Sequence, residues 1–367
     1  MLPFLLIPPV IGTAALIVYL EASGRFLGSA PTLTPIDVPI DTDGLAGVEA
    51  WIQEEFHAKP ALMRKSDKSP RDLLAEKRRL FDAMGTERTF DATFTPATAS
   101  ANGLDVPGEW TTVKGSDPDL RLIYYHGGGF TVGSPQSHRA LTVRLARDLG
   151  ASVFAPDYRL RPEHAHLDAV ADCAAAYRWV LDNSPSGSAP VRGLFVAGDS
   201  AGGNLSLVTL QWARDQGLRP ADACAVFSPS TDYTLTGKSL KTNFKTDTML
   251  RPLFAPFMKV PKPLLTYGLW KTNGARPSDA RISPLFGDLA GLPPTLIQVS
   301  PTEILYDDAT RYAAQAANAG SPVQLEVFTG ASADAPLPHV WQMFDRELPA
   351  ARDALDRTAA YLLAQIT

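Results

Sequence analysis

The sequence predicts an α/β fold with a mostly parallel central sheet, helices on both of its faces and a helical cap. From Leu120 onward, short apolar segments rich in β-branched and aromatic residues alternate with helical segments. Strands that are apolar along their whole length are typical of a parallel sheet covered on both faces. The chain has 367 residues, of which 45% are hydrophobic, so it can bury a core of this size.

The elements are predicted in the following order. Residues 45–85 are expected to hold two helices, the second starting at Pro70 with Ser69 as its N-cap. Extended segments follow near 88–95 and 109–114. The alternating part then has predicted strands at 120–125, 151–156, 193–198, 223–229, 294–300 and 323–328, and predicted helices at 138–149, 167–183, 201–216, 305–319 and 347–365. In the last helix, leucines at heptad spacing and an alanine mark one stripe that we expect to be buried: Leu348, Ala351, Leu355 and Leu362.

One interval interrupts this alternation. Residues 232–282 contain helical pieces, prolines and aromatic residues but no clear strand. Because a bare loop of that length is uncommon in a compact domain, we interpret the interval as a cap element that packs beside the N-terminal helices and covers the site. The predicted organisation is an apolar N-terminal segment (1–25), N-terminal cap helices (26–85), an α/β body (86–231 and 283–367) and a cap insertion (232–282).

Charge and cysteine content exclude several classes of protein. The net charge of −5 and the pI near 5.7 argue against nucleic-acid binding, which calls for a basic surface. Cys173 and Cys224 lie in apolar segments and form no CxxC pair, so we expect two buried, reduced thiols. A zinc site at His164 and His166 is a weak alternative because no further ligands are suitably spaced. We expect no metal and no cofactor.

Residues 2–20 are apolar and carry no charge, although three prolines interrupt their first half. Two interpretations stay open: a membrane anchor or interfacial helix, or a segment packed on the protein's own cap. No Lys or Arg precedes the segment and no small-residue cleavage site follows it, which argues against a secretory signal peptide. Basic residues such as Arg25 and Lys65 follow it, so we expect a protein in the cytoplasm or attached to the cytoplasmic face of a membrane.

The strongest local pattern is Gly198-Asp199-Ser200-Ala201-Gly202, between a predicted strand and a predicted helix. It fits the G-x-S-x-G turn that exposes a nucleophilic serine at the start of a helix. The flanking glycines are needed because bulkier side chains would collide with the neighbouring strand or helix. An ordinary glycine-rich turn is the alternative, but the strand and helix on either side favour a nucleophile at Ser200.

A second pattern, His126-Gly127-Gly128-Gly129-Phe130, follows the strand at 120–125. Acyl transfer creates an oxyanion that needs preorganised N–H donors. We expect the backbone N–H groups of Gly128, Gly129 and Ala201 to donate, with His126, Gly127 and Asp199 in supporting roles. A phosphate-binding loop is the rival interpretation, but no Gly-Lys-Ser/Thr follows.

A nucleophilic serine needs a base, and the base needs an acid that orients it. After a nucleophile of this kind the triad follows in the order serine, acid, histidine. Only His339 among the six histidines lies after Ser200, so it is the predicted base. The acid should follow the strand at 294–300. Glu303 is the favoured candidate because it lies nearest the strand end; the alternatives are Asp307 and Asp308.

Together these segments resemble the bacterial hormone-sensitive-lipase-like esterases, a branch of the α/β-hydrolases, over residues 85–365. The motifs that carry the resemblance are HGGGF (126–130), DYRLRPEH (157–164), GDSAGGNL (198–205), SPLFGDLAGLPPTLIQV (283–299), EILYDD (303–308) and PHVWQMF (338–344). The resemblance implies a Ser-Glu/Asp-His triad, a tripartite oxyanion hole, a cap and a small-molecule ester substrate with a short to medium acyl chain. It also implies that Tyr158, Arg159 and Glu163 brace the core.

The sequence departs from the family pattern at three places. Ser300 stands where a glycine is usual, Glu303-Ile304-Leu305 replaces Asp-Pro-Leu, and residues 331–337 lengthen the loop before His339. Alternatives to a short-chain esterase are a non-catalytic receptor on the same fold, an amidase or deacetylase, and a lipid esterase if residues 2–20 anchor the chain. The oligomeric state stays open between a monomer and a homodimer, which is frequent in the family.

Overall fold

The computed structural model describes residues 33–59, 68–329 and 336–366, and its centre is a nine-stranded sheet. The strands are β1 (Ile36–Pro39), β2 (Thr93–Ala101), β3 (Leu104–Thr112), β4 (Asp117–Tyr125), β5 (Ala151–Pro156), β8 (Gly193–Asp199), β9 (Ala223–Phe227), β10 (Thr295–Val299) and β11 (Val323–Thr329). Their order in space is β1-β11-β10-β9-β8-β4-β5-β3-β2. Neighbours from β1 to β5 run parallel, whereas β2 and β3 form an antiparallel hairpin whose β3 also pairs antiparallel with β5. A mostly parallel sheet, as predicted, is confirmed.

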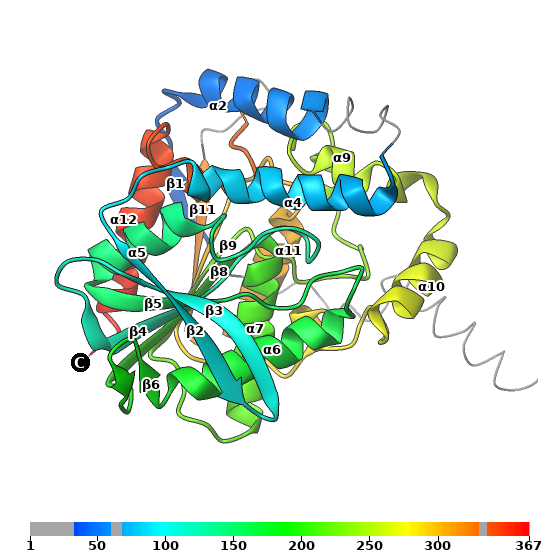
Figure 1. Cartoon of the computed structure of the whole chain (residues 1–367). Coiled ribbons are helices and arrows are strands. Elements are labelled where there is room, and N and C mark those ends of the chain that lie inside the picture. The colour runs from blue at the N-terminus through cyan, green and yellow to red at the C-terminus, as the bar shows by residue number, and fades with distance from the viewer. Residues whose placement is uncertain (1–32, 60–67, 330–335, 367) are drawn as a thin grey trace, which may run out of the picture.

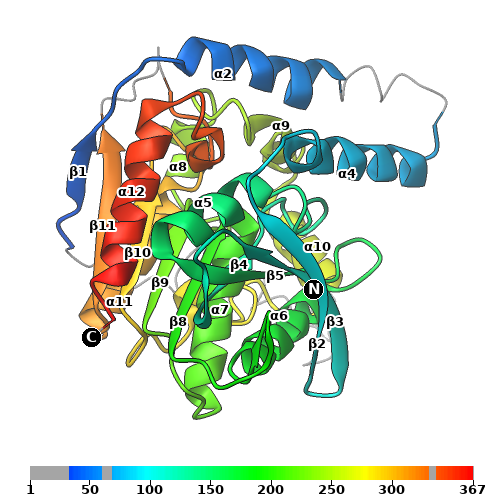
Figure 2. The same cartoon turned by 60° about the vertical axis from the view of Figure 1, so that its left-hand side comes forward.

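Helices cover both faces of this sheet, as Figures 1 and 2 show. Their bounds are α5 (Arg139–Leu149), α6 (His166–Val180), α7 (Ser200–Asp215), α11 (Tyr306–Asn318) and α12 (Pro349–Leu363). Two separate cores result, one between the sheet and α5 with α12, the other between the sheet and α6, α7 and α11. Successive residues of a strand point to opposite faces: Tyr124 packs in the first core and Tyr125 in the second. All strands and helices predicted after Leu120 are present, with ends shifted by a few residues.

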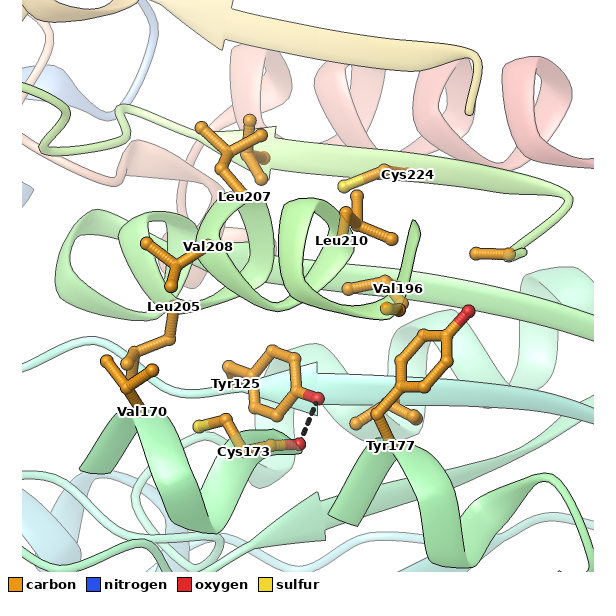
Figure 3. Close-up of a cluster of buried hydrophobic side chains, with 14 of the residues drawn as sticks. Tyr125, Val170, Cys173, Tyr177, Val196, Leu205, Leu207, Val208, Leu210 and Cys224 are labelled. Atoms are coloured by element: carbon orange, nitrogen blue, oxygen red, sulfur yellow. Dashed lines mark hydrogen bonds between the residues drawn. The ribbon is translucent and has the colours of Figure 1, made fainter. Parts of the chain in front are cut away.

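Both cysteines lie in the second core, which Figure 3 shows in part. Cys173 on α6 and Cys224 on β9 are buried free thiols, as predicted. The hydroxyl of Tyr125 donates to the backbone oxygen of Cys173 at 3.0 Å. Burial raises the pKa of both thiols, so they stay protonated and pack as small apolar side chains.

The cap comes from two parts of the chain. Its first part consists of α2 (Leu45–Ile52) and α4 (Pro70–Thr86), and α2 continues into the short π-helix η1 (Gln53–Ala58). Its second part, in the predicted insertion, consists of α8 (Ser239–Thr242), α9 (Arg251–Phe254), η2 (Phe257–Lys259) and α10 (Lys262–Asn273). The Ser69 hydroxyl accepts from the N–H of Asp72 at 3.2 Å, which confirms the predicted N-cap of α4. Thr248 joins the two parts: its backbone oxygen contacts Nε2 of His57 at 2.7 Å, and its hydroxyl donates to Glu49 at 2.9 Å.

Strand β1 is the main departure from the predicted organisation. It lies in the range 26–85 assigned to the cap, yet it pairs in parallel with β11 at the edge of the sheet. Only Val38 of its four residues is buried, and Ile36 is 44% exposed. A four-residue edge strand with one buried side chain has no readable periodicity, so the strand was missed.

The leucine stripe of α12 supplies a stability test. Leu348, Ala351, Leu355 and Leu362 are all fully buried, as predicted. Replacing Leu355 by Ala leaves a cavity between α12 and the sheet and should lower the free energy of unfolding by about 2–5 kcal/mol. Urea denaturation measures this, with Leu363→Ala on the same helix as the control. Leu363 is 41% exposed, so its replacement should change the free energy by less than about 0.5 kcal/mol. Equal losses in the two variants would contradict the assigned stripe.

Candidate active site

Ser200 occupies a sharp turn between β8 and α7 with φ of 53°, a left-handed conformation that a serine rarely adopts. The turn requires glycine on both sides. A Cβ at Gly202 would lie 1.9 Å from the backbone oxygen of Tyr125, and one at Gly198 would lie 2.6 Å from the oxygen of Gly202. The structure thus has the predicted strand, turn and helix, and it places Ser200 at the N-terminus of α7, where helix N–H groups and the helix dipole favour negative charge.

His339 and Glu303 are in direct contact, although 36 residues separate them in sequence. Nδ1 of His339 lies 2.7 Å from Oε2 of Glu303, and both side chains are buried. The other carboxylate oxygen accepts from the N–H of Ser300 at 2.8 Å and from the hydroxyl of Ser228 at 2.9 Å. Since a carboxylate only accepts, Nδ1 carries the proton and Nε2 presents its lone pair. Within the described residues, Nε2 is buried and has no hydrogen-bond partner.

The other two candidate acids point elsewhere. Oδ2 of Asp307 accepts from the backbone N–H groups of Lys238 and Ser239. Asp308 accepts from the N–H of Thr231 at 2.7 Å and from that of Asp232 at 2.9 Å. Both aspartates therefore fasten the base of the cap insertion, and of the three candidates only Glu303 reaches His339 in the described structure.

Backbone strain is concentrated around these side chains. Besides Ser200, three non-glycine residues next to the site have positive φ: Phe130 (60°), Ser228 (46°) and Val340 (54°). Phe130 ends the glycine loop, Ser228 holds Glu303, and Val340 follows His339. Strained conformations persist only where the surrounding structure enforces them, and they are common at functional sites.

A second buried carboxylate, Asp247 of the cap insertion, faces the same pair. Oδ2 of Asp247 accepts from the N–H of Ile304 at 2.8 Å, and Oδ1 accepts from the N–H of Leu250 at 2.9 Å. Burial raises the pKa of Asp247 to about 6; the charge of His339 lowers it and that of Glu303 raises it further. Burial by itself lowers the pKa of His339, but the hydrogen bond and charge of Glu303, with the charges of Asp247 and Asp199, leave it raised.

The loop that carries Glu303 is held by the base of the cap insertion. The side-chain amide of Asn243 donates to the backbone oxygens of Pro301 and Glu303, both at 2.8 Å. The hydroxyl of Thr246 donates to the oxygen of Thr302 at 2.8 Å. Together with Asp247 these bonds make the acid loop and the cap one connected structure. No motif in the sequence signals this set, because it forms only when residues almost sixty positions apart meet.

The glycine loop approaches Ser200 from β4. Gly128 and Gly129 have φ of 112° and 61°, so both adopt backbone conformations that favour glycine. No backbone hydrogen bond among the described residues uses their N–H groups, and both glycines line the same cavity as Ser200. Ala201 lies in the first turn of α7, where an N–H has no partner within the helix. Two of the predicted donors, Gly128 and Gly129, thus line the cavity, and the third, Ala201, directly follows Ser200, which also lines it.

The supporting residues anchor this loop to the turn. A Cβ at Gly127 would lie 2.0 Å from Oδ2 of Asp199, and Oδ1 of Asp199 accepts from the N–H of Gly127 at 3.0 Å. The Tyr124 hydroxyl donates to the same oxygen at 2.7 Å. His126 stacks on Tyr158, with ring centroids 4.1 Å apart, and its backbone oxygen accepts from the Tyr158 hydroxyl at 2.7 Å.

Sequence reasoning missed one member of this group, His138, which was expected only as the start of a helix. It is fully buried, and its Nε2 lies 3.2 Å from the N–H of Gly127 and 3.4 Å from Asp199 Oδ1. Burial alone would raise the pKa of Asp199, but His138, Tyr124 and His126 lower it overall, so Asp199 stays ionised. No pattern in the sequence could have shown that two histidines and a tyrosine meet behind the turn of Ser200.

Ser200 and His339 open into one cavity of about 320 Å³. The cap supplies most of its apolar wall. The lining side chains include Trp51, Leu80 and Met84 from the N-terminal cap, Met249, Leu250 and Leu253 from the insertion, and Met343 from the loop after His339. A small apolar pocket with a few convergent polar groups suits an uncharged organic ligand.

The sequence left open a zinc site at His164 and His166 and a membrane anchor at residues 2–20. Within the described residues there is no cluster of three or more His, Cys, Asp or Glu that could hold a metal ion. His166 packs against Phe130 with ring centroids 4.3 Å apart, and burial lowers its pKa to about 3. Of the helices that the structure describes, none combines the length and the apolar content needed to cross a bilayer. Residues 2–20 and 331–335 lie outside the described residues.

Comparison with known proteins agrees with this geometry. Residues 122–335 match a family described as having the α/β-hydrolase fold. An acetyl-hydrolase of Streptomyces hygroscopicus is 37% identical over 255 residues, which cover 69% of this chain and 78% of that protein. An esterase of Acinetobacter venetianus is 35% identical over 259 residues, covering 70% and 78%. The crystal structure of an esterase from the bacterial hormone-sensitive lipase family is 33% identical, with a TM-score of 0.70 and coverage of 88% of this chain and 98% of that one.

The chain therefore belongs to the α/β-hydrolase fold family, in the branch of the bacterial hormone-sensitive-lipase-like esterases. It is a carboxylic ester hydrolase of the serine type. The predicted fold, family and class of enzyme are confirmed.

Asp247 gives a test of the electrostatics. Asp247→Asn removes a negative charge near His339, so the pKa of His339 should fall. An NMR pH titration of the histidine ring signals measures this. Asp279→Asn is the control, because Asp279 lies in the same insertion but pairs with Arg281 at 2.8 Å. An unchanged or higher pKa of His339 in Asp247→Asn would show that the two side chains do not interact as described.

Proposed function

We propose that Ser200, His339 and Glu303 form the catalytic triad, and that the enzyme cleaves esters with short to medium acyl chains through an acyl-enzyme intermediate. The observation that carries the proposal is the contact of Nδ1 of His339 with Glu303, which leaves a buried, unpartnered Nε2 beside the cavity that Ser200 lines. This arrangement suits a base that takes a proton from a serine hydroxyl.

In the first half of the proposed reaction, Nε2 of His339 takes the proton of Ser200 as Oγ attacks the ester carbonyl carbon. The resulting imidazolium is stabilised by the carboxylate of Glu303, which keeps its own negative charge. His339 then gives the proton to the leaving alcohol oxygen, and the acyl group stays on Ser200. In the second half, Nε2 of His339 takes a proton from a water molecule whose oxygen attacks the acyl carbon. His339 then returns this proton to Oγ of Ser200 as the bond between Oγ and the acyl carbon breaks and the acid is released.

The oxyanion that forms in each half needs fixed donors. We assign this role to the backbone N–H groups of Gly128, Gly129 and Ala201, with Gly127 and Asp199 fixing the loop against the nucleophile turn. The positive φ of both loop glycines and the unused N–H groups support this assignment. Donors that are already in place cost no reorganisation when the charge develops, and the loss of one typically slows such a reaction about 10²–10³-fold.

The cavity supports the choice of acyl length. At about 320 Å³ it is near the lower limit for small-molecule pockets. A relative is named an acetyl-hydrolase, and a solved esterase, EstE5, 30% identical, was soaked with p-nitrophenyl butyrate. Apolar cap side chains line this cavity, and an acyl or alcohol chain would pack against them. We place no metal and no cofactor in the reaction.

The role of Ser200 can be tested with p-nitrophenyl butyrate. Ser200→Ala removes the nucleophile, so kcat should fall about 10⁴–10⁶-fold, as when other serine hydrolases lose theirs. Ser188→Ala, a change at an exposed serine of the small β6–β7 hairpin (Asn183–Ser184 and Gly187–Ser188), should leave kcat unchanged. Esterase activity that survives in a folded Ser200→Ala protein would refute the assignment.

The choice of acid can be tested by a matched pair of variants. Glu303→Gln keeps the shape of the side chain but loses the charge that fixes the His339 tautomer, so kcat should fall by about 10³–10⁴-fold. Asp307→Asn changes an acid four residues away that contacts cap backbone instead, and should cost less than about tenfold. Steady-state kinetics on one soluble ester compares the two. The reverse order of losses would make Asp307 the acid.

Acyl preference is measured with p-nitrophenyl esters from acetate to palmitate. We expect kcat/KM to peak at short or medium chains and to fall steeply for palmitate, because a cavity of about 320 Å³ is small for a long acyl chain. A peak at palmitate would instead indicate lipid substrates. The matching p-nitroanilides are assayed in parallel, and faster turnover of the anilides than of the esters would favour an amidase. No turnover of any ester or anilide by the folded protein would favour a receptor.

A further inference from the structure

Helix α10 of the cap insertion exposes apolar side chains and buries polar ones. Leu264 is 64% exposed and Tyr267 is 51% exposed, whereas Thr266 and Asn273 are buried at 3% and 0%. Leu264, Tyr267 and Lys271 follow one another at intervals of three and four residues, so they lie on one outer face of the helix. In Figure 1, α10 (yellow) lies at the margin of the molecule, away from the sheet. A surface helix normally shows the opposite pattern.

Further exposed apolar side chains lie in the segment before α10. Seven large apolar side chains are exposed in the part of the chain that the structure describes, and five of them lie between positions 253 and 267. These five are Leu253, Met258, Val260, Leu264 and Tyr267. We call them, with Lys259 and Lys271 among them, the cap face. Single exposed apolar residues are ordinary, but such a concentration indicates an interaction surface.

The charge of the insertion narrows the choice of partner. Residues 232–282 contain nine Lys and Arg against three Asp and no Glu, a net charge of +6, although the whole chain carries −5. Two of the aspartates, Asp232 and Asp247, are buried, and the third, Asp279, pairs with Arg281. Lys259 and Lys271 are exposed and form no ion pair with any carboxylate that the structure describes.

We propose that the cap face binds the surface of a lipid bilayer that contains anionic lipids. Its apolar side chains would enter the boundary between headgroups and acyl chains, and its lysines would reach the phosphates. Charge complementarity favours this partner over two others. The uncharged segment 2–20 offers no carboxylate to Lys259 and Lys271, and a second copy of the cap face would bring like charges together.

The location of the cap face beside the cavity suggests that the membrane contact gives the site access to esters in the bilayer. Leu253 is 51% exposed on the cap face and also lines the cavity that holds Ser200. Leu253 therefore belongs both to the cavity wall and to the proposed membrane contact. An ester dissolved in the bilayer could pass along Leu253 into the site without crossing bulk water. The membrane contact itself does not depend on the proposed triad, because it is read out by binding.

The test is co-sedimentation of the full chain with vesicles of phosphatidylcholine alone or mixed with phosphatidylglycerol. We expect the double variant Leu264→Glu/Tyr267→Glu to lower the partition coefficient at least tenfold. Lys259→Gln/Lys271→Gln should lower it about fivefold per lysine on the anionic vesicles and little on the neutral ones. The matched control is Ile36→Glu/Leu363→Glu, which changes two exposed apolar side chains elsewhere and should bind as the unmodified protein does.

All variants should hydrolyse soluble p-nitrophenyl butyrate at the rate of the unmodified protein, which shows that they are folded. Equal vesicle binding by cap-face variants and unmodified protein would overturn the proposal and assign the contact to another part of the chain, such as residues 2–20. No preference for anionic vesicles would also overturn it. A change in oligomeric state with no change in vesicle binding would identify the cap face as a contact between copies instead.

Discussion

The hydrogen bond between Glu303 and His339 is the interaction on which the rest of the site depends. A buried carboxylate is stable only when its oxygens are paired, and here the backbone of Ser300, the hydroxyl of Ser228 and the ring of His339 supply the partners. Those partners come from the ends of β9 and β10 and from the loop after β11. The parallel sheet brings these ends to one edge, and the cap insertion holds the loop of Glu303 from outside through Asn243 and Asp247. A substitution in the cap insertion can therefore change the position of His339 indirectly, because it acts through the loop of Glu303.

A second constraint acts at Ser200, the proposed nucleophile. The turn at Ser200 is compact because Gly198 and Gly202 let β8, α7 and the end of β4 approach within distances that exclude any side chain. Behind it Asp199 accepts a hydrogen bond from Gly127, which connects the turn of Ser200 to the loop of the proposed oxyanion donors. The left-handed backbone conformation of Ser200 is strained, and the surrounding contacts must offset this strain. The cap supplies most of the apolar wall and so sets the size of the cavity.

The sequence predicted the elements with strong local signals and missed those that depend on distant contacts. The central strands are apolar along their length, so their positions were read nearly to the residue. The positions of β1 and of most of β2 were not predicted, because edge strands bury few side chains and β2 carries Pro96 and several alanines. Ser200 and His339 followed from a motif and from elimination. Asp247 and His138 could not be predicted, because nothing in their local sequence indicates that they fold against the acid and the nucleophile.

The most direct test of the account is the site at which a serine-directed reagent reacts. After treatment with phenylmethylsulfonyl fluoride, mass spectrometry should find one adduct, on Ser200, in the unmodified protein. His339→Gln should suppress this adduct, because the hydroxyl then has no base to take its proton. Labelling of a different residue, or labelling of Ser200 that is equally fast without His339, would contradict the proposed pairing of Glu303, His339 and Ser200.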